Sequence, residues 1–402
     1  MFFGWRVVAG AFVGMMLANG FFTYAFTILV NPIREEFGVS LEQVMYSLTI
    51  GTLCGLVVAP VTGILIDRHS VRHLMTAGTL LTAVGFYLIA IANSIVVFNI
   101  SVGITMSIAM ATTGSMSGSA AVSRWFTHSL GKAMGIASMG TSLGGIVVPA
   151  LLTWWLESEG WRGAMHNLSL ITLLVVAPFI WLSVRSRPAD IGLHAEGLQA
   201  TADSTGEAVM EALNMGQIIR MPAFWFIGLS MGMVFSAFAS MLANLAPYAA
   251  RLGTGEAKIS TMIALLAVGG LVGKISFGMA ADRINLKLGL WMAHALLATA
   301  FLILIFEPPY TLMLVAAACF GLSTGGLLPV WNAMVARIFG IDSFGRTMGA
   351  MGPLITMCII PAYILLGRLF DSTGSYTAGL VLFTGVIGLG SALLIPLKVL
   401  PR

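Results

Sequence analysis

Long apolar segments, separated by short polar connections, make up almost the whole chain. Most of them run for roughly 20 residues or more, the length that an α-helix needs to cross a hydrocarbon layer about 30 Å thick. Counting such runs predicts twelve membrane-spanning helices, at residues 4–30, 41–66, 73–92, 94–123, 131–156, 164–184, 222–249, 257–281, 286–306, 309–338, 345–370 and 376–398. The pattern therefore predicts an all-α membrane protein.

The only long polar segment lies between the sixth and the seventh predicted helix. It covers residues 186–220 and carries charges of both signs, as expected of a surface linker. We therefore expect an N-terminal six-helix bundle at residues 1–185, a cytoplasmic linker at 186–220 and a C-terminal six-helix bundle at 221–402.

Composition and charge support this class. Hydrophobic residues make up 58% of the chain and charged residues only 9%, and the mean hydropathy is +0.95; soluble domains have about 25% charged residues. Of the 20 lysines and arginines, fourteen fall on the side that holds both termini and the linker, and five fall on the other. Because positive residues concentrate in cytoplasmic loops, both termini are predicted to be cytoplasmic. The basic residues lie in short connections, so nucleic acid is not an expected partner.

Three motifs occur in the same order in both halves of the chain. They are Gly63-Ile-Leu-Ile-Asp67-Arg68 and Gly278-Met-Ala-Ala-Asp282-Arg283 after the second and eighth helices, Arg124 and Arg337 at the ends of the fourth and tenth, and Gly131 and Gly345 at the starts of the fifth and eleventh. The nearly constant offset between the copies indicates that a six-helix unit was duplicated. Two pseudo-symmetric bundles are therefore expected.

These residues resemble the signatures of a known family. The Gly-x-x-x-Asp-Arg pattern, which begins at Gly63 and again at Gly278, is similar to the loop motif of the major facilitator superfamily. Within it, the stretches GWRVVAGAF, TYAFTILVNPIREEFGVS, GWRGA and RSRPADIGL resemble the branch of monocarboxylate porters and oxalate/formate exchangers. The resemblance covers the whole chain. It implies a bacterial transporter of the cytoplasmic (inner) membrane that works by alternating access, with its substrate cavity between the bundles near the bilayer midplane.

The duplicated motifs are candidates for a gate at the cytoplasmic face. Small residues such as Gly63 let helices approach closely, and a helix dipole stabilises an Asp near the helix N-terminus by about 0.3–1 kcal/mol. We expect Asp67 to reach the start of the eleventh helix, near Gly345, and to hold this face closed. The candidate gating residues are Gly63, Asp67, Arg68, Arg72, Arg124, Gly278, Asp282, Arg283 and Arg337. The alternative is that they are ordinary loop residues that set the topology.

Lys274 is a cation that lies deep within a predicted span. It stands eight residues before Asp282, about 12 Å along a helix. A charge at that depth costs about 3 kcal/mol, and an anion bound in a water-lined cavity would offset this cost. The resemblance implies that polar and aromatic residues of other spans line the same cavity, namely Asn19, Tyr24, Ser115, Ser119, Asn244, Trp331, Asn332 and Tyr363. The alternatives are that Lys274 extends to the cytoplasmic surface and that the other residues only pack helices together.

The charge of this site predicts a class of substrate. One cation matches one carboxylate, whereas a dicarboxylate would need two. The related branch usually carries an arginine at the position of Lys274, and a lysine, unlike an arginine, can lose its proton in an apolar environment. No carboxylate stands in the middle of a predicted span. We therefore predict a secondary active transporter of a small monocarboxylate of the lactate or pyruvate type, in which proton and anion enter together as a neutral pair.

Three other functions are kept as alternatives. They are an exchanger of organic anions, a proton-driven exporter of drugs or other amphiphiles, and a non-transporting sensor on the same fold. The sequence has no nucleophile–base spacing, phosphate loop or metal-ligand cluster, so we expect no enzyme, no cofactor and no metal. The expected partners are a small organic anion, protons and the lipid bilayer, and the expected state is a monomer. His166 and His294 are interpreted as packing residues, with a titrating role as the alternative.

Overall fold

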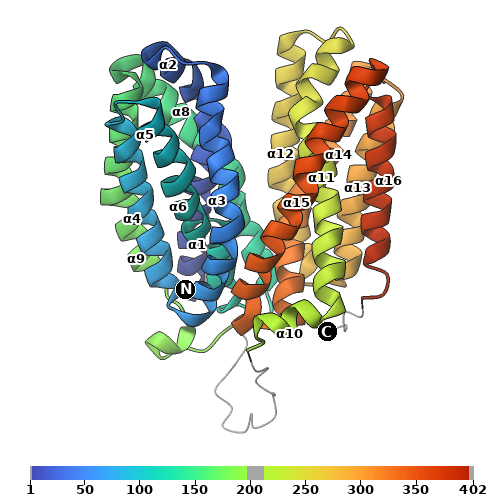
Figure 1. Ribbon diagram of the computed structural model, residues 1–402. Coiled ribbons are helices and arrows are strands. Elements are labelled where there is room, and N and C mark those ends of the chain that lie inside the picture. The colour runs from blue at the N-terminus through green and yellow to red at the C-terminus, as the bar shows by residue number, and fades with distance from the viewer. Residues whose placement is uncertain (1, 197–211, 398–402) are drawn as a thin grey trace. The chain divides into compact units, whose positions relative to one another are not determined.

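The computed structural model describes residues 2–196 and 212–397, and within them it contains helices and connections but no β-strand. Residues 197–211 of the predicted linker and Lys398, the predicted end of the twelfth helix, lie outside the described part. The chain forms two compact units (Figure 1): the first comprises Met1–Ala212 and Gly340–Ala350, and the second comprises Leu213–Phe339 and Met351–Arg402. The short segment Gly340–Ala350 thus belongs with the N-terminal half, although its position in the sequence is in the C-terminal half.

Six helical spans form the first unit. In chain order its elements are α1 (Gly4–Asn19), the π-helix η1 (Gly20–Ala25), α2 (Phe26–Phe37), α3 (Leu41–Arg68), α4 (Val71–Ala90), α5 (Ile95–Ile100), the π-helix η2 (Ser101–Met106), α6 (Ser107–Thr113), α7 (Ser115–Ser123), α8 (Leu130–Ile171), the π-helix η3 (Thr172–Val176), α9 (Ala177–Ser183) and the 3₁₀-helix η4 (Pro188–Ile191). Local chemistry sets the ends: Ser40 and Gln43 form a capping box at the start of α3, which satisfies two free backbone N–H groups.

The second unit contains the remaining spans. Its elements are α10 (Met215–Arg220), α11 (Pro222–Arg251), α12 (Glu256–Ala281), α13 (Leu286–Ile305), α14 (Tyr310–Phe339), most of α15 (Phe344–Thr373) and α16 (Thr377–Leu393). The 3₁₀-helix η5 (Ile341–Ser343) and the first turns of α15 belong to the first unit. The helix α15 therefore starts in one unit and continues into the other.

The helix count agrees with the sequence. Within the described residues, ten helical segments are long and apolar enough to cross a membrane. One of them, Leu130–Ser183, contains Gly160 with a φ of 72°, a left-handed conformation that glycine adopts readily, and the chain turns there into a second span. With α16, which has 17 residues, the total is twelve. The prediction of an all-α protein with twelve membrane-spanning helices is confirmed.

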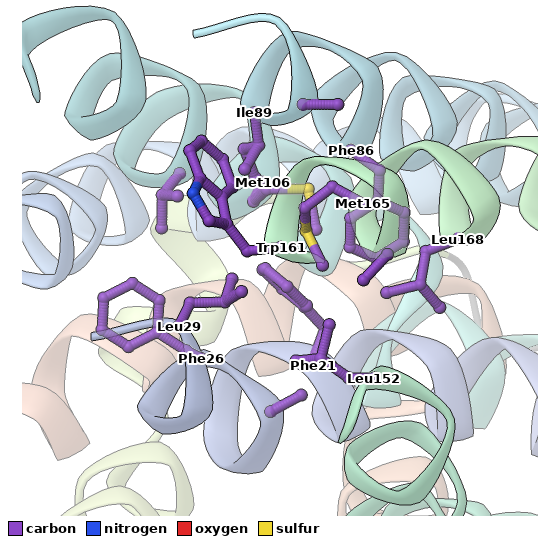
Figure 2. Close-up of a cluster of buried hydrophobic side chains, with 14 of the residues drawn as sticks. Phe21, Phe26, Leu29, Phe86, Ile89, Met106, Leu152, Trp161, Met165 and Leu168 are labelled. Carbon is purple, nitrogen blue, oxygen red and sulfur yellow. The ribbon is translucent and has the colours of Figure 1, made fainter. Parts of the chain in front are cut away.

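A buried apolar cluster holds one end of the first unit together (Figure 2). Phe21, Phe26 and Leu29 of the first span point toward Phe86 of α4 and Trp161 of α8. The rings of Phe21 and Phe86 meet edge to face, with their centroids 4.8 Å apart. Aromatic pairs of this geometry add stability beyond the area that they bury.

Several helix ends differ from the sequence-based prediction by a few residues, most clearly at the first span. The first span was predicted to end at residue 30, but its helix continues to Phe37 and stops where Gly38 adopts a φ of 62°. The first part of the predicted linker, which begins at residue 186, is bound to the first unit: Glu196 accepts a hydrogen bond from the backbone N–H of Ser129 at 2.9 Å. This carboxylate lies at the start of α8, where the helix dipole favours a negative charge.

Candidate functional site

Lys274 lies in the apolar helix α12, seven residues before its end at Ala281. The side chain is almost fully buried, with 7% of its surface exposed. A cation at such a position is expensive in a membrane and usually marks a binding site or an ion pathway.

Glycines bring α14 against α12 at the level of this lysine. A Cβ atom on Gly325 would lie 2.2 Å from the carbonyl oxygen of Gly270 and 2.9 Å from the backbone nitrogen of Lys274. A Cβ atom on Gly321 would lie 2.1 Å from the carbonyl oxygen of Leu266. Larger residues would push the helices apart, so this packing depends on glycine, as in other close contacts between membrane helices.

Trp331 and Asn332 lie on α14 and are both buried, with 7% and 1% of their surfaces exposed. The ring of Trp331 meets Phe235 of α11 at a centroid distance of 6.0 Å. Its indole N–H finds no acceptor among the described residues. Because buried donors normally have a partner, this N–H is available to a bound molecule or a water.

The other two candidates of the second unit have different environments. Asn244 on α11 donates from Nδ2 to the carbonyl oxygen of Ser240 at 2.9 Å and accepts from the hydroxyl of Tyr376 at 3.3 Å. Its amide is therefore used in helix packing. Tyr363 on α15 is 45% exposed.

In the first unit, four candidates lie on the first and fourth spans. Asn19 donates from Nδ2 to the carbonyl oxygen of Met15 at 3.2 Å, and Tyr24 is 45% exposed. Ser119 on α7 is buried and Ser115 is half-buried. The structure therefore distributes the predicted binding residues over both units.

Both of these spans are irregular next to their candidate residues, which the sequence reasoning missed. The π-helix Gly20–Ala25 directly follows Asn19 and contains Tyr24. The fourth span breaks at Gly114, whose ψ of −151° separates α6 from α7 just before Ser115. Such breaks are frequent at functional sites. The adjacent Gly and Ser at the break were the one available signal, since Gly/Ser pairs often kink helices.

The gating candidate Asp67 stands at the end of α3 and binds the start of α15. One carboxylate oxygen accepts from the backbone N–H of Gly345 at 2.8 Å, and the other accepts from that of Arg346 at 2.9 Å. The Nε atom of Arg346 lies 3.5 Å from the same carboxylate, whose side chain has no exposed surface. Two free N–H groups at a helix start and a neighbouring cation stabilise a buried carboxylate.

Glycines make this contact possible. A Cβ atom on Gly63 would lie 2.2 Å from the carbonyl oxygen of Gly345, and one on Gly349 would lie 2.6 Å from that of Ala59. The α3 backbone and the first turns of α15 are therefore in direct contact, and Asp67 lies one turn further along α3.

Arg124 lies close to the same helix end. It is buried, and its guanidinium donates to the carbonyl oxygen of Ile66 at 2.8 Å. Burial lowers the pKa of Arg124, and the positive charge of Arg187 adds to this effect, whereas the negative charge of Asp67 opposes it. Arg124 thereby connects the end of the fourth span to the end of α3.

The neighbouring arginines have other contacts. Arg72 at the start of α4 donates from Nε to the carbonyl oxygen of Trp181 at 3.0 Å, and its guanidinium lies 3.5 Å from the centre of that ring. This cation–π contact packs α4 against α9. Arg68 is exposed.

The second copy of the motif occupies corresponding helix ends in the second unit. Gly278 is buried in α12, Asp282 follows the last residue of that helix and is half-buried, and Arg283 is exposed. Arg337 lies in the last turn of α14 and is half-buried.

Twelve apolar helices, duplicated motifs and a buried cation define a polytopic membrane transporter. The family model of the Major Facilitator Superfamily matches residues 10–357, and the chain belongs to this superfamily. It is therefore an integral multi-pass membrane protein that moves small molecules across the membrane.

Individual relatives agree with this assignment. Monocarboxylate transporter 13 of Bos taurus is 25% identical over 397 residues, covering 98% of this chain and 89% of the relative. The Fujikurins efflux protein of Gibberella fujikuroi is 25% identical over 410 residues, covering 98% and 82%. Among solved structures, the human organic anion transporter MFSD10 superposes with a TM-score of 0.76 at 16% identity, covering 97% of this chain and 99% of that one.

Proposed function

We propose that this transporter carries a small monocarboxylate of the lactate or pyruvate type and that Lys274 binds its carboxylate. The observation that carries the proposal is the burial of this cation inside an apolar helix, with 7% of its surface exposed. The resemblance to monocarboxylate transporter 13 supports the same substrate class. The buried indole N–H of Trp331 would supply a second, neutral donor from α14.

We infer that transport is coupled to protons. Burial of an ammonium group in an apolar helix carries a desolvation cost, and this cost is lower if the lysine is neutral while no anion is bound. Binding of a proton together with an anion leaves the site without net charge. The occupied transporter can then change conformation at lower cost, which is the basis of symport.

We propose that the Asp67 contacts form the gate. Since α15 starts in the first unit and continues into the second, a carboxylate bound to its first turn links the motion of the helix to α3. The contacts would break when α15 moves. We further propose that both termini are cytoplasmic, that the membrane is a bacterial inner membrane and that the protein works as a monomer.

A ligand screen on the purified protein tests the substrate class. Pyruvate and lactate should raise its melting temperature, and Lys274→Ala should abolish this stabilisation. Lys274→Arg should retain part of it, because the charge is kept while the donor geometry changes. The matched control is Lys258→Ala, which removes an exposed lysine of the same helix. Stabilisation that survives Lys274→Ala would refute the role of this residue.

A pH gradient across proteoliposomes tests the coupling. With the outside more acidic than the inside, uptake of labelled pyruvate should exceed uptake at equal pH, because proton and anion move in the same direction. Uptake that ignores the gradient but depends on internal carboxylate would instead establish anion exchange.

Export of amphiphiles is the second candidate function, because one relative of equal identity is the Fujikurins efflux protein. It predicts that lipophilic compounds, and not pyruvate, stabilise the protein in the same screen.

A further inference from the structure

A cavity between α13 and α16 lies outside the candidate transport site. The two helices lie side by side in the second unit (Figure 1), and the cavity between them has a volume of about 580 Å³. This is within the range of small-molecule pockets, about 300–1,000 Å³. Its walls are mostly small or apolar, with two alanines from α13 and Ile387, Gly388 and Ala392 from α16.

The space exists because a side chain is missing from one wall. A Cβ atom built on Gly388 would meet no atom within 4 Å. The surface around the opening is apolar and exposed: Leu389 and Ile395 have 61% and 63% of their surfaces accessible. In a membrane, the cavity would therefore open toward the apolar surroundings.

The imidazole of His294, which lies beside Ser391 in the wall of the cavity, has a hydrogen-bond partner at only one of its two nitrogens within the described part of the chain. The hydroxyl of Ser391 donates to the carbonyl oxygen of Ile387 at 2.9 Å, and it lies 3.0 Å from Nδ1 of His294. Because the hydroxyl proton is committed to the carbonyl, Ser391 can only accept from Nδ1. From these two contacts we infer that the neutral imidazole carries its proton on Nδ1.

The other ring nitrogen of His294 is then an acceptor. It is buried, with 1% of the residue exposed, and it finds no partner among the described residues. His294 is one of the residues that line the cavity. A buried acceptor without a partner carries a desolvation cost, which a hydrogen-bond donor entering the cavity would remove.

The position of His294 along α13, far from the membrane interface, indicates which class of ligand can reach it. At one end of the cavity, Lys287 donates to the carbonyl oxygens of Ile395 and Leu397, and its ammonium lies 4.9 Å from the ring of Trp291. Lysine and tryptophan are typical of the membrane interface. His294 is seven residues beyond Lys287, about 10 Å deeper along the helix. A phosphate group would stay at the level of Lys287, so the donor at His294 must belong to a largely apolar molecule.

We propose that this cavity binds a neutral amphiphile that has an apolar body and a hydroxyl group, and that the hydroxyl donates to Nε2 of His294. Sterols and long-chain alcohols both have this chemistry. The apolar body lies in the space left open at Gly388 and contacts Ile387 and Ala392.

Four probes test the proposal on the full-length protein in phosphatidylcholine nanodiscs. Dodecan-1-ol and cholesterol represent the two sources of the hydroxyl, and dodecyl methyl ether and cholesteryl methyl ether are the matched compounds that cannot donate. At least one alcohol should raise the melting temperature and bind about tenfold more tightly than its ether, the upper end of what one neutral hydrogen bond contributes. The alcohol that binds more tightly shows whether the natural ligand is a sterol or a straight-chain alcohol.

Substitutions locate the site. Gly388→Phe should abolish the stabilisation by filling the cavity, whereas Gly385→Phe should preserve it, because Gly385 also faces open space on the same helix but does not line the cavity. The His294→Phe variant should bind the alcohol and its ether equally. If this variant does not fold, the comparison of Gly388→Phe with Gly385→Phe tests the proposal. Equal binding of alcohol and ether to the unaltered protein, or stabilisation that survives Gly388→Phe, would overturn the proposal. A lower oligomeric mass of the Gly388→Phe variant than of the unaltered protein would also overturn the proposal. It would show that a second copy of the chain, and not an alcohol, occupies the cavity.

Discussion

At the scale of single residues, charge burial is the decisive feature of this protein. Asp67 keeps its carboxylate away from water by accepting two backbone hydrogen bonds from the start of α15. Lys274 is buried to a similar extent in α12. A buried charge is tolerated only where polar groups or opposite charges compensate it, so both positions constrain what surrounds them.

Replacing Asp67 by Asn should lower the stability of the protein. The amide has one acceptor oxygen in place of two and carries no charge, so one N–H of α15 loses its partner. We expect a loss of about 1–3 kcal/mol, measured as a fall in the melting temperature of the purified protein. Asp371→Asn, which neutralises an exposed carboxylate on the same helix α15, should leave the melting temperature unchanged. Equal effects of the two substitutions would show that the Asp67 contacts add nothing to stability.

At the scale of elements, glycines determine which helices can touch. In α12 and α14, backbones meet at Gly270 and Gly325. In α3 and α15, they meet at Gly63 and Gly345. In each pair the close approach places a buried charge, Lys274 or Asp67, against the neighbouring helix.

The same substitution at two positions of α3 should therefore have opposite effects. Gly63→Ala puts a methyl group 2.2 Å from the carbonyl oxygen of Gly345, so the start of α15 must move away. We expect a destabilisation of about 1–3 kcal/mol, as for other overpacked contacts. Gly55→Ala meets no atom within 4 Å and should stabilise the helix by up to about 1 kcal/mol, since alanine is the better helix former. Thermal unfolding of the two variants side by side checks the sign of each effect.

At the scale of the whole molecule, a duplicated six-helix unit explains why the same motif occurs twice. The relatives cover nearly all of this chain, so the architecture is shared from end to end. The structure deviates from a simple division into halves at Gly340–Ala350, which packs with the first unit. The helix α15 thus begins in the first unit and continues into the second.

Cysteine labelling in intact cells should establish the proposed topology. In a background where Cys54, Cys319 and Cys358 are replaced by Ser, Ser158→Cys should react with a membrane-impermeant maleimide added outside. Asp190→Cys should react only after the membrane is made permeable, because it lies on the side richer in positive charge. Both positions are exposed. The reverse pattern of labelling would show that both termini lie outside the cell.

The sequence alone predicted the twelve helices, the duplication and the buried cation. A long apolar segment in a membrane forms an α-helix, because its backbone N–H and C=O groups must then bond within the segment itself. Lys274 was recognisable because a charge interrupting such a run is visible without a structure. The predicted end of the first span at residue 30 was less accurate, because the more polar residues that follow it remain helical up to Phe37.

The sequence had predicted that Asp67 reaches the start of the eleventh helix near Gly345, but only the tertiary structure identified the atoms and the other contacts. It showed that Asp67 binds the N–H groups of Gly345 and Arg346, that the fourth span breaks at Gly114, and that His294 faces a cavity beside Ser391. These features depend on contacts between segments that lie far apart in the chain. Hydrophobicity determines that a segment enters the membrane, whereas the shape and polarity of its neighbours determine which of its residues meet.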